Sequence, residues 1–107
     1  MKIQLWIATP ESSTQDVAIF DTGAQITLIP ISKNIYFEQT GETMLIDFDN
    51  APQYIAPKGY CYVSLDGYEW EKIPCARSTT DSLILSPYHL TKWYFVVLGD
   101  TVTAYRV

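Results

Sequence analysis

The sequence predicts a single all-β domain spanning residues 1–107. Apolar and polar residues alternate along short runs, of which Lys2–Ala8 is the clearest. Turn-forming residues separate these runs at short intervals, as is typical of all-β domains. The chain carries one clear helix signal: Ser86 is a suitable N-cap and is followed by proline, which predicts one or two helical turns over Pro87–Trp93. We therefore expect mostly strand and little helix.

In the N-terminal half, residues that favour turns bound each expected strand. Thr9–Gln15 is a turn-rich connection after the first strand, and Pro30 ends the third. An Asp-Asn-Ala-Pro segment predicts the tip of a hairpin between the fourth and fifth strands. The expected strands are Lys2–Ala8, Val17–Phe20, Ile26–Ile29, Met44–Phe48 and Tyr54–Ile55.

In the C-terminal half, two hairpins and one short buried strand are expected. Asp66-Gly67 is the strongest short hairpin signal in the chain, and Gly99-Asp100 is the turn of a closing hairpin. The first hairpin is Tyr60–Leu65 with Tyr68–Ile73, the buried strand is Leu83–Leu85, and the closing hairpin is Tyr94–Leu98 with Thr101–Val107.

The composition argues against several classes of function. Hydrophobic residues make up 48% of the chain and charged residues 18%, as expected for a globular domain and not a disordered one. The net charge is −5 and Lys and Arg do not cluster, so we expect no direct nucleic-acid surface in this domain. The longest apolar runs, such as Tyr94–Leu98, are too short to cross a membrane, and we expect no secretion signal.

Candidate ligands for a metal or a cofactor are few. Cys61 and Cys75, the only cysteines, lack metal-ligand spacing. We interpret them as buried free thiols, with a disulfide between them as the alternative. Asp47, Asp49 and Asn50 could form a cation loop, but they lack EF-hand spacing, and we favour a polar hairpin tip. We therefore expect no metal and no cofactor.

The sole histidine, His89, is a weak candidate for catalysis. A hydrolase triad needs a serine or cysteine nucleophile beside the histidine, and no nucleophile motif such as Gly-x-Ser-x-Gly occurs. We expect His89 to be an exposed residue on the short helix.

The most informative segment is residues 17–30, with the sequence VAIFDTGAQITLIP. Asp21 lies between two apolar strands, where a charged group costs free energy unless hydrogen bonds or function compensate. Gly23 allows a tight turn that brings backbone N–H groups toward the carboxylate. Thr22 offers a hydroxyl that can lock the turn, and Ala24 leaves room for a ligand. An ordinary β-turn is the alternative, but such turns seldom place a carboxylate at the end of an apolar strand.

The segment FDTGAQITLIP resembles the active site of retroviral aspartic proteases, the retropepsins, in which an Asp-Thr/Ser-Gly-Ala motif lies between apolar strands. Two further segments fall in the order and spacing of that family. Met44–Lys58 corresponds to the flap hairpin that closes over the substrate, and Ser82–Trp93 to a second apolar strand that leads into a short helix. The resemblance implies a small closed barrel protomer with a flap hairpin and one short C-terminal helix.

The second segment narrows the resemblance to foamy virus (spumavirus) proteases. Orthoretroviral proteases usually carry Gly-Arg-Asp/Asn after the Ile-Leu strand, and the arginine pairs with an aspartate just after Asp-Thr-Gly-Ala. At the position of the Gly-Arg-Asp/Asn motif this chain has Ser86, Pro87 and Tyr88. At the position of the aspartate this chain has Gln25, so both partners of the ion pair are absent together. Ile-Leu-Ser-Pro at this position is similar to the foamy virus proteases.

The resemblance implies an aspartic endopeptidase that cleaves viral polyprotein, with Asp21 as the catalytic residue. Thr22, Gly23 and Ala24 would form the active-site loop around it. Because a chain of 107 residues carries one such motif, the second carboxylate must come from another copy, and we expect a homodimer. The two carboxylates would share one proton, so that the ionised one activates water and the protonated one polarises the scissile carbonyl.

The resemblance also implies the substrate and the location. An extended peptide would bind by strand addition between a flap and a wall, in the virion or the host cell cytoplasm. The residues assigned to them are Phe48, Asp49, Asn50 and Ala51 in the flap and Leu83, Ile84 and Leu85 in the wall.

The assembly of the isolated domain is expected to be weak. The absent ion pair, the closing hairpin and the charge of −5 all predict weak dimerisation. Whether the native chain stays joined to a reverse transcriptase is left open. Two alternatives also stay open: a catalytically silent retropepsin-like module for dimerisation or peptide binding, and an unrelated β-barrel adaptor in which Asp-Thr-Gly is only a turn.

Overall fold

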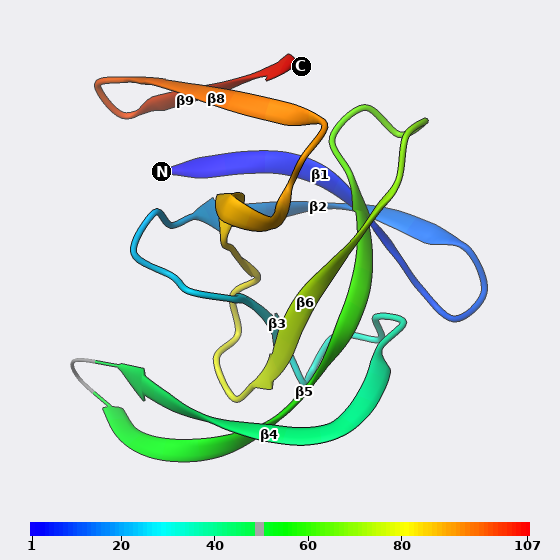
Figure 1. Ribbon diagram of the computed structural model, residues 1–107, viewed down its shortest axis with the longest axis vertical. Coiled ribbons are helices and arrows are strands. Elements are labelled where there is room, and N and C mark those ends of the chain that lie inside the picture. Colours follow the sequence, from blue (N-terminus) through cyan, green and yellow to red (C-terminus); the bar gives the residue numbers. More distant parts are fainter. Residues whose placement is uncertain (49–50) are drawn as a thin grey trace.

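The structure of the protein is a computed structural model that describes residues 1–48 and 51–107. In this part of the chain nearly all regular structure is strand, which confirms the all-β class (Figure 1). The elements are β1 Lys2–Ala8, β2 Ser13–Phe20, β3 Thr27–Pro30, β4 Glu38–Phe48, β5 Ala51–Ser64, β6 Glu71–Ser78, β7 Ile84–Leu85, the 3-10 helix η1 Pro87–His89, β8 Trp93–Leu98 and β9 Thr101–Arg106. None of the helical structure in these ranges is long and apolar enough to span a membrane.

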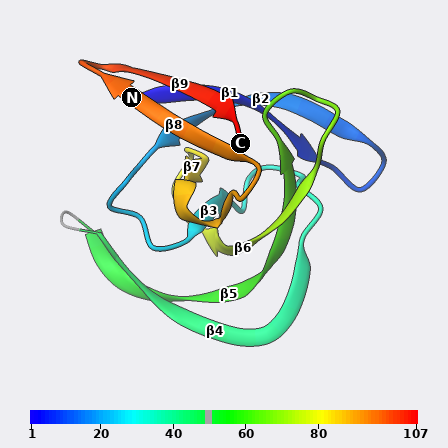
Figure 2. The same ribbon diagram turned by 45° about the horizontal axis from the view of Figure 1, so that its top comes forward.

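Seven of the strands form one strongly curved sheet in the order β1-β2-β7-β3-β6-β5-β4. The sheet curls back on itself, because β1 also pairs with β5 through Trp6↔Ser64 and Ile7↔Val63. β4 lies outside this ring as the outer strand of a long hairpin with β5, which sweeps across the bottom of the view in Figure 1. β8 and β9 form a separate two-stranded sheet that lies over β1 (Figure 2).

The alternation of side chains along the curled strands builds two apolar clusters. The main core lies inside the ring and contains Leu5, Ile7, Ile73 and Leu85, none of them exposed to solvent. A smaller cluster lies between the β4–β5 hairpin and the strands that follow Asp21. Its buried members are Ile26, Leu28, Ile46, Ala56, Ala76 and Ile84.

Cys61 and Cys75 are free thiols in the main core, which confirms the preferred interpretation. Their positions on β5 and β6 are diagonal, since Cys61 pairs with Ile73 and Cys75 with Gly59. The hydrogen bond between the two thiols, followed by burial, raises the pKa of Cys61 well above its ordinary value. The thiol form is therefore strongly favoured in the folded protein.

Two predicted strand starts near the hairpins were wrong. β2 begins at Ser13 and not at Val17, because Ser13 pairs with Ala8 of β1, and the connection shrinks to Thr9–Ser12. β4 begins at Glu38 and not at Met44, because Glu38 pairs with Tyr60 of β5. Backbone pairing with a neighbouring strand, which a single strand's hydrophobic pattern does not reveal, sets these ends.

The predicted two-residue turn at Asp66-Gly67 was also wrong. β5 ends at Ser64 and β6 begins at Glu71, so the connection is a six-residue loop over 65–70. The Asp66 carboxylate accepts hydrogen bonds from the N–H groups of Tyr68 and Glu69, both at 2.9 Å. These bonds lower the pKa of Asp66, that from Glu69 most, and they favour a side-chain-capped loop over a tight hairpin.

The C-terminal region confirms the predicted helix position and the closing hairpin. The helix is a single 3-10 turn over Pro87–His89, shorter than the predicted range. His89 is half-buried, which corrects the expectation of an exposed residue, and its Nδ1 atom is buried without a hydrogen-bond partner among the described residues. In the hairpin, Phe95 packs against Phe20 with ring centroids 5.0 Å apart, and Arg106 forms ion pairs with the 65–70 loop.

Candidate active site

Asp21 lies directly after β2, where two neighbouring elements hold its backbone. β2 runs parallel to β7, with Ile19 opposite Ile84 and Phe20 opposite Leu85. The N–H of Asp21 donates to the carbonyl oxygen of Leu85 at 3.1 Å. The apolar strand predicted before Asp21 thus anchors the residue in the sheet and leaves its side chain half-buried.

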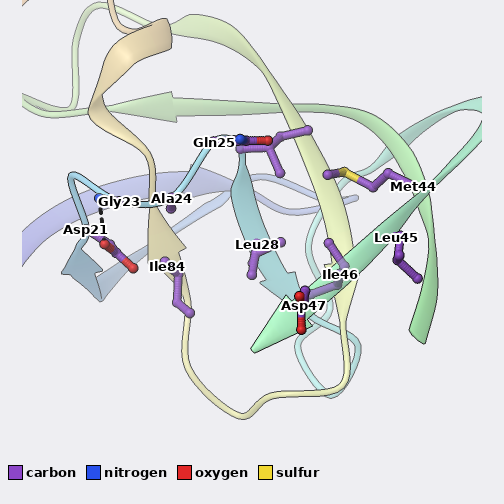
Figure 3. Close-up of a pocket in the computed structure, with 11 residues that line it drawn as sticks. Asp21, Gly23, Ala24, Gln25, Leu28, Met44, Leu45, Ile46, Asp47 and Ile84 are labelled. Atoms are coloured by element: carbon purple, nitrogen blue, oxygen red, sulfur yellow. Dashed lines mark hydrogen bonds between the residues drawn. The ribbon is translucent and has the colours of Figure 1, made fainter. Parts of the chain in front are cut away.

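The Asp-Thr-Gly-Ala turn wraps around the Asp21 carboxylate. The N–H of Gly23 donates to Asp21 Oδ1 at 2.9 Å, drawn as a dashed line in Figure 3, and the N–H of Ala24 donates to the Asp21 carbonyl oxygen at 3.3 Å. A Cβ atom on Gly23 would lie 3.3 Å from Asp21 Oδ1. Glycine is therefore favoured here by space, since Gly23 is not among the glycines with positive φ.

Two hydrogen bonds from the segment after β7 hold the turn and the strand that follows it, and sequence reasoning missed both. The hydroxyl of Thr27 on β3 accepts from the N–H of Ser86 at 3.1 Å, and both residues are fully buried. The hydroxyl of Tyr88 donates to the carbonyl oxygen of Thr22. Both contacts join residues about sixty positions apart, so only the parallel and antiparallel pairings of β7 with β2 and β3 bring them together.

A cleft of about 450 Å³ opens beside Asp21 (Figure 3). Its floor is apolar and belongs to the smaller core cluster, and its far side is the β4 strand of the long hairpin. The lining residues are Asp21, Gly23, Ala24, Gln25, Ile26, Leu28, Met44, Leu45, Ile46, Asp47 and Ile84. An open trough with an apolar floor and carboxylates along its sides has a shape and chemistry that suit an extended peptide as ligand.

The structure brings only part of the predicted wall to this cleft. Of the strand at 83–85, Ile84 lines the cleft, whereas Leu83 and Leu85 point into the main core and are buried. Successive side chains of a strand face opposite sides, so a short strand between the core and the cleft can give the cleft only its central residue. The expectation for Leu83 and Leu85 is therefore corrected to core packing.

The remaining predicted site residues are placed as follows. Gly23 and Ala24 line the cleft beside Asp21, and Thr22 is exposed on the outer side of the same turn. Phe48 and Ala51 form the last backbone pair of the β4–β5 hairpin. The predicted flap residues between them, Asp49 and Asn50, lie outside the described residues.

The described residues contain no group of three or more His, Cys, Asp or Glu side chains that could hold a metal ion. Gln25 lines the cleft next to the turn. Orthoretroviral proteases usually have an aspartate at this position and an arginine at the position of Pro87. This chain has the neutral amide of Gln25 and a proline instead, so that ion pair is absent. The N–H groups of Gly23 and Ala24 already donate to Asp21, so the Asp21 carboxylate is the charged group that this turn presents to a ligand in the cleft.

The chain is similar to two solved structures of foamy virus proteins. One is the foamy viral protease-reverse transcriptase in complex with an RNA/DNA hybrid, with a TM-score of 0.57, 23% identity and coverage of 81% of this chain and 11% of that chain. The other is the solution structure of the simian foamy virus (mac) protease, with a TM-score of 0.55, 21% identity and coverage of 83% of this chain and 90% of that chain. No protein-family model and no curated protein matches the chain.

The curled sheet, with an Asp-Thr-Gly-Ala turn beside a cleft, is a retroviral protease fold. Within that class the chain is similar to the foamy virus protease, as the Ile-Leu-Ser-Pro segment predicted. The chain has about the length of the simian foamy virus protease but spans only 11% of the protease-reverse transcriptase.

Proposed function

We propose that this chain is one protomer of an aspartic endopeptidase, with Asp21 as its catalytic residue. The observation that carries the proposal is the position of the Asp21 carboxylate. It lies at the edge of a cleft of about 450 Å³ with an apolar floor and is oriented by the Gly23 N–H at 2.9 Å. An ionised carboxylate held in this way can accept a proton from a water molecule that attacks a peptide carbonyl.

The second carboxylate comes from another copy of the chain. The described residues contain one Asp-Thr-Gly turn, and a two-fold axis beside it would bring two Asp21 carboxylates together. Two carboxylates this close share one proton, so one acts as base while the other polarises the scissile carbonyl. The exposed position of Thr22 on the same turn is compatible with such an interface.

The substrate is an extended segment of viral polyprotein, bound between the cleft floor and the β4–β5 hairpin, which serves as the flap. The foamy viral protease-reverse transcriptase among the similar structures supports a native context in which the domain is joined to a reverse transcriptase. In that context the protease would act in the virion and the host cell cytoplasm.

Hydrolysis of a peptide mixture by the purified protein tests the proposal. The wild-type protein should cleave, Asp21→Asn should not, and Asp100→Asn in the exposed β8–β9 turn should match the wild type. Activity should survive metal chelators and fall at alkaline pH, where the shared proton is lost. Undiminished cleavage by Asp21→Asn, or loss of cleavage with EDTA, would refute the mechanism. A wild-type protein without any cleavage would favour the catalytically silent module.

A further inference from the structure

Among the described residues that line the cleft, the charged side chains are both carboxylates. They belong to Asp21 beside the active-site turn and to Asp47 on the β4 side, and none of these described residues is Lys or Arg. In the view of Figure 3, the apolar side chains of Leu28 and Ile84 lie between these two carboxylates. A ligand that spans the cleft therefore passes from one acidic group to the other over an apolar floor.

The backbone of β4 changes its register at Asp47. Ile46 pairs with Tyr54 and Phe48 with Ala51, so Asp47 alone lies opposite two residues of β5, at positions 52 and 53. The extra residue of this bulge lies on β5, and a bulge increases the local twist of the paired strands beside Asp47. Ile46 on the one side is buried in the cluster under the hairpin, whereas Asp47 is exposed.

The Asp47 carboxylate has no ion pair within the described part of the chain. The lysines and arginines that do pair there contact other acidic groups: Lys33 pairs with Asp16, Lys72 with Glu38, and Lys92 and Arg106 with the 65–70 loop. A cationic group of a bound ligand can therefore form an ion pair with Asp47.

We propose that Asp47 is a specificity-determining residue that selects peptides carrying a lysine or arginine side chain at the subsite beside β4. This inference rests on the proposed peptidase function. A peptide that fills the trough covers the apolar floor and excludes water from around Asp47, which strengthens its attraction for a cation. A neutral side chain at the same subsite would leave the partly desolvated Asp47 carboxylate without an opposite charge, and an acidic side chain would be repelled by it.

The two-fold symmetry of the assembled enzyme extends the proposal. Each copy contributes its own Asp47, so the two carboxylates lie on opposite sides of the scissile bond. The preference for a basic residue should therefore appear at two peptide positions, one on each side of the cleavage site. A single carboxylate selects by charge and not by fixed geometry, so lysine and arginine should both be accepted.

Cleavage profiling with a systematic peptide set tests the inference. A cleaved reference peptide is resynthesised with Lys, Gln or Glu at each position in turn, and kcat/KM is measured for each peptide. The enzymes are the wild type, Asp47→Asn and Asp47→Lys. The matched control is Glu42→Gln, which removes an exposed carboxylate of the same strand that is not a lining residue.

The wild type should prefer Lys over Gln by about two- to fivefold in kcat/KM at the subsite beside β4, the range of one partly exposed ion pair. Asp47→Asn should bring that ratio to about one, Asp47→Lys should invert it in favour of Glu, and Glu42→Gln should keep it. Added salt should weaken the preference. A wild type that cleaves without a basic preference, or a preference that survives Asp47→Asn, overturns the inference and leaves the proposed peptidase intact. A wild type that cleaves no peptide overturns both.

Discussion

Replacing Thr27 by valine tests the brace between β3 and the segment after β7. Valine has nearly the same shape as threonine but cannot accept the hydrogen bond from the Ser86 N–H, which is 3.1 Å long and fully buried. An unsatisfied buried N–H costs about 1–3 kcal/mol. For a domain of this size each kcal/mol lowers the melting temperature by about 4 °C, so Thr27→Val should melt about 4–12 °C lower than the wild type.

Activity should fall with stability, because β3 and β7 flank the turn that carries Asp21. Thr27→Ser keeps the acceptor and loses one methyl group, so it should lose about 1 kcal/mol and retain catalysis. The matched control is Thr103→Val on the exposed hairpin, which should change stability by less than about 0.5 kcal/mol. Thermal and urea unfolding supply the measurement. A Thr27→Val protein as stable and active as Thr103→Val would refute the role of this hydrogen bond.

Three further predictions concern the loop, the sheet surface and assembly. Tyr88→Phe removes the hydrogen bond to the Thr22 carbonyl and should lower kcat/KM about two- to tenfold with an unchanged circular dichroism spectrum; an unchanged kcat/KM would contradict the brace. The hydrogen bond from Tyr62, and next the one from Lys72, lowers the pKa of Glu38. Glu38→Gln should therefore lower the free energy of unfolding above about pH 4.3. That difference should vanish as the pH falls through the lowered pKa, and equal unfolding curves at pH 7 would contradict it. Sedimentation equilibrium should find a mostly monomeric domain at low micromolar concentration that dimerises more in high salt; a dimer that persists at nanomolar concentration in low salt would contradict this.

Local patterns allowed much of the fold to be predicted. The apolar strand before Asp21 and the glycine after it lie next to each other in the sequence, and the structure keeps them together. The closing hairpin was predicted with its strands at Tyr94–Leu98 and Thr101–Val107, within one residue at each end of β8 and β9. Ser86-Pro87 marked the start of the short helix for the same reason, since proline fixes the backbone of its own residue.

Features that depend on partners distant in the sequence were not predictable. The core-facing positions of Leu83 and Leu85 follow from the register of a two-residue strand held between β2 and β3. The contact between Tyr88 and Thr22 depends on the same register. No pattern within either segment indicates which of three adjacent apolar residues faces a cleft, because hydrophobicity alone does not distinguish the two sides of a strand buried on both faces.

A mixing experiment with Asp21→Asn tests most directly the claim that two copies each supply one catalytic carboxylate. Total protein is held constant while half of the wild type is replaced by Asp21→Asn, and peptide hydrolysis is measured. If the active site needs Asp21 from both copies, only pairs of wild-type protomers are active, and activity should fall to about one quarter whether the dimer is weak or tight. If each chain acts alone, activity should fall only to about one half, and that result would contradict the account.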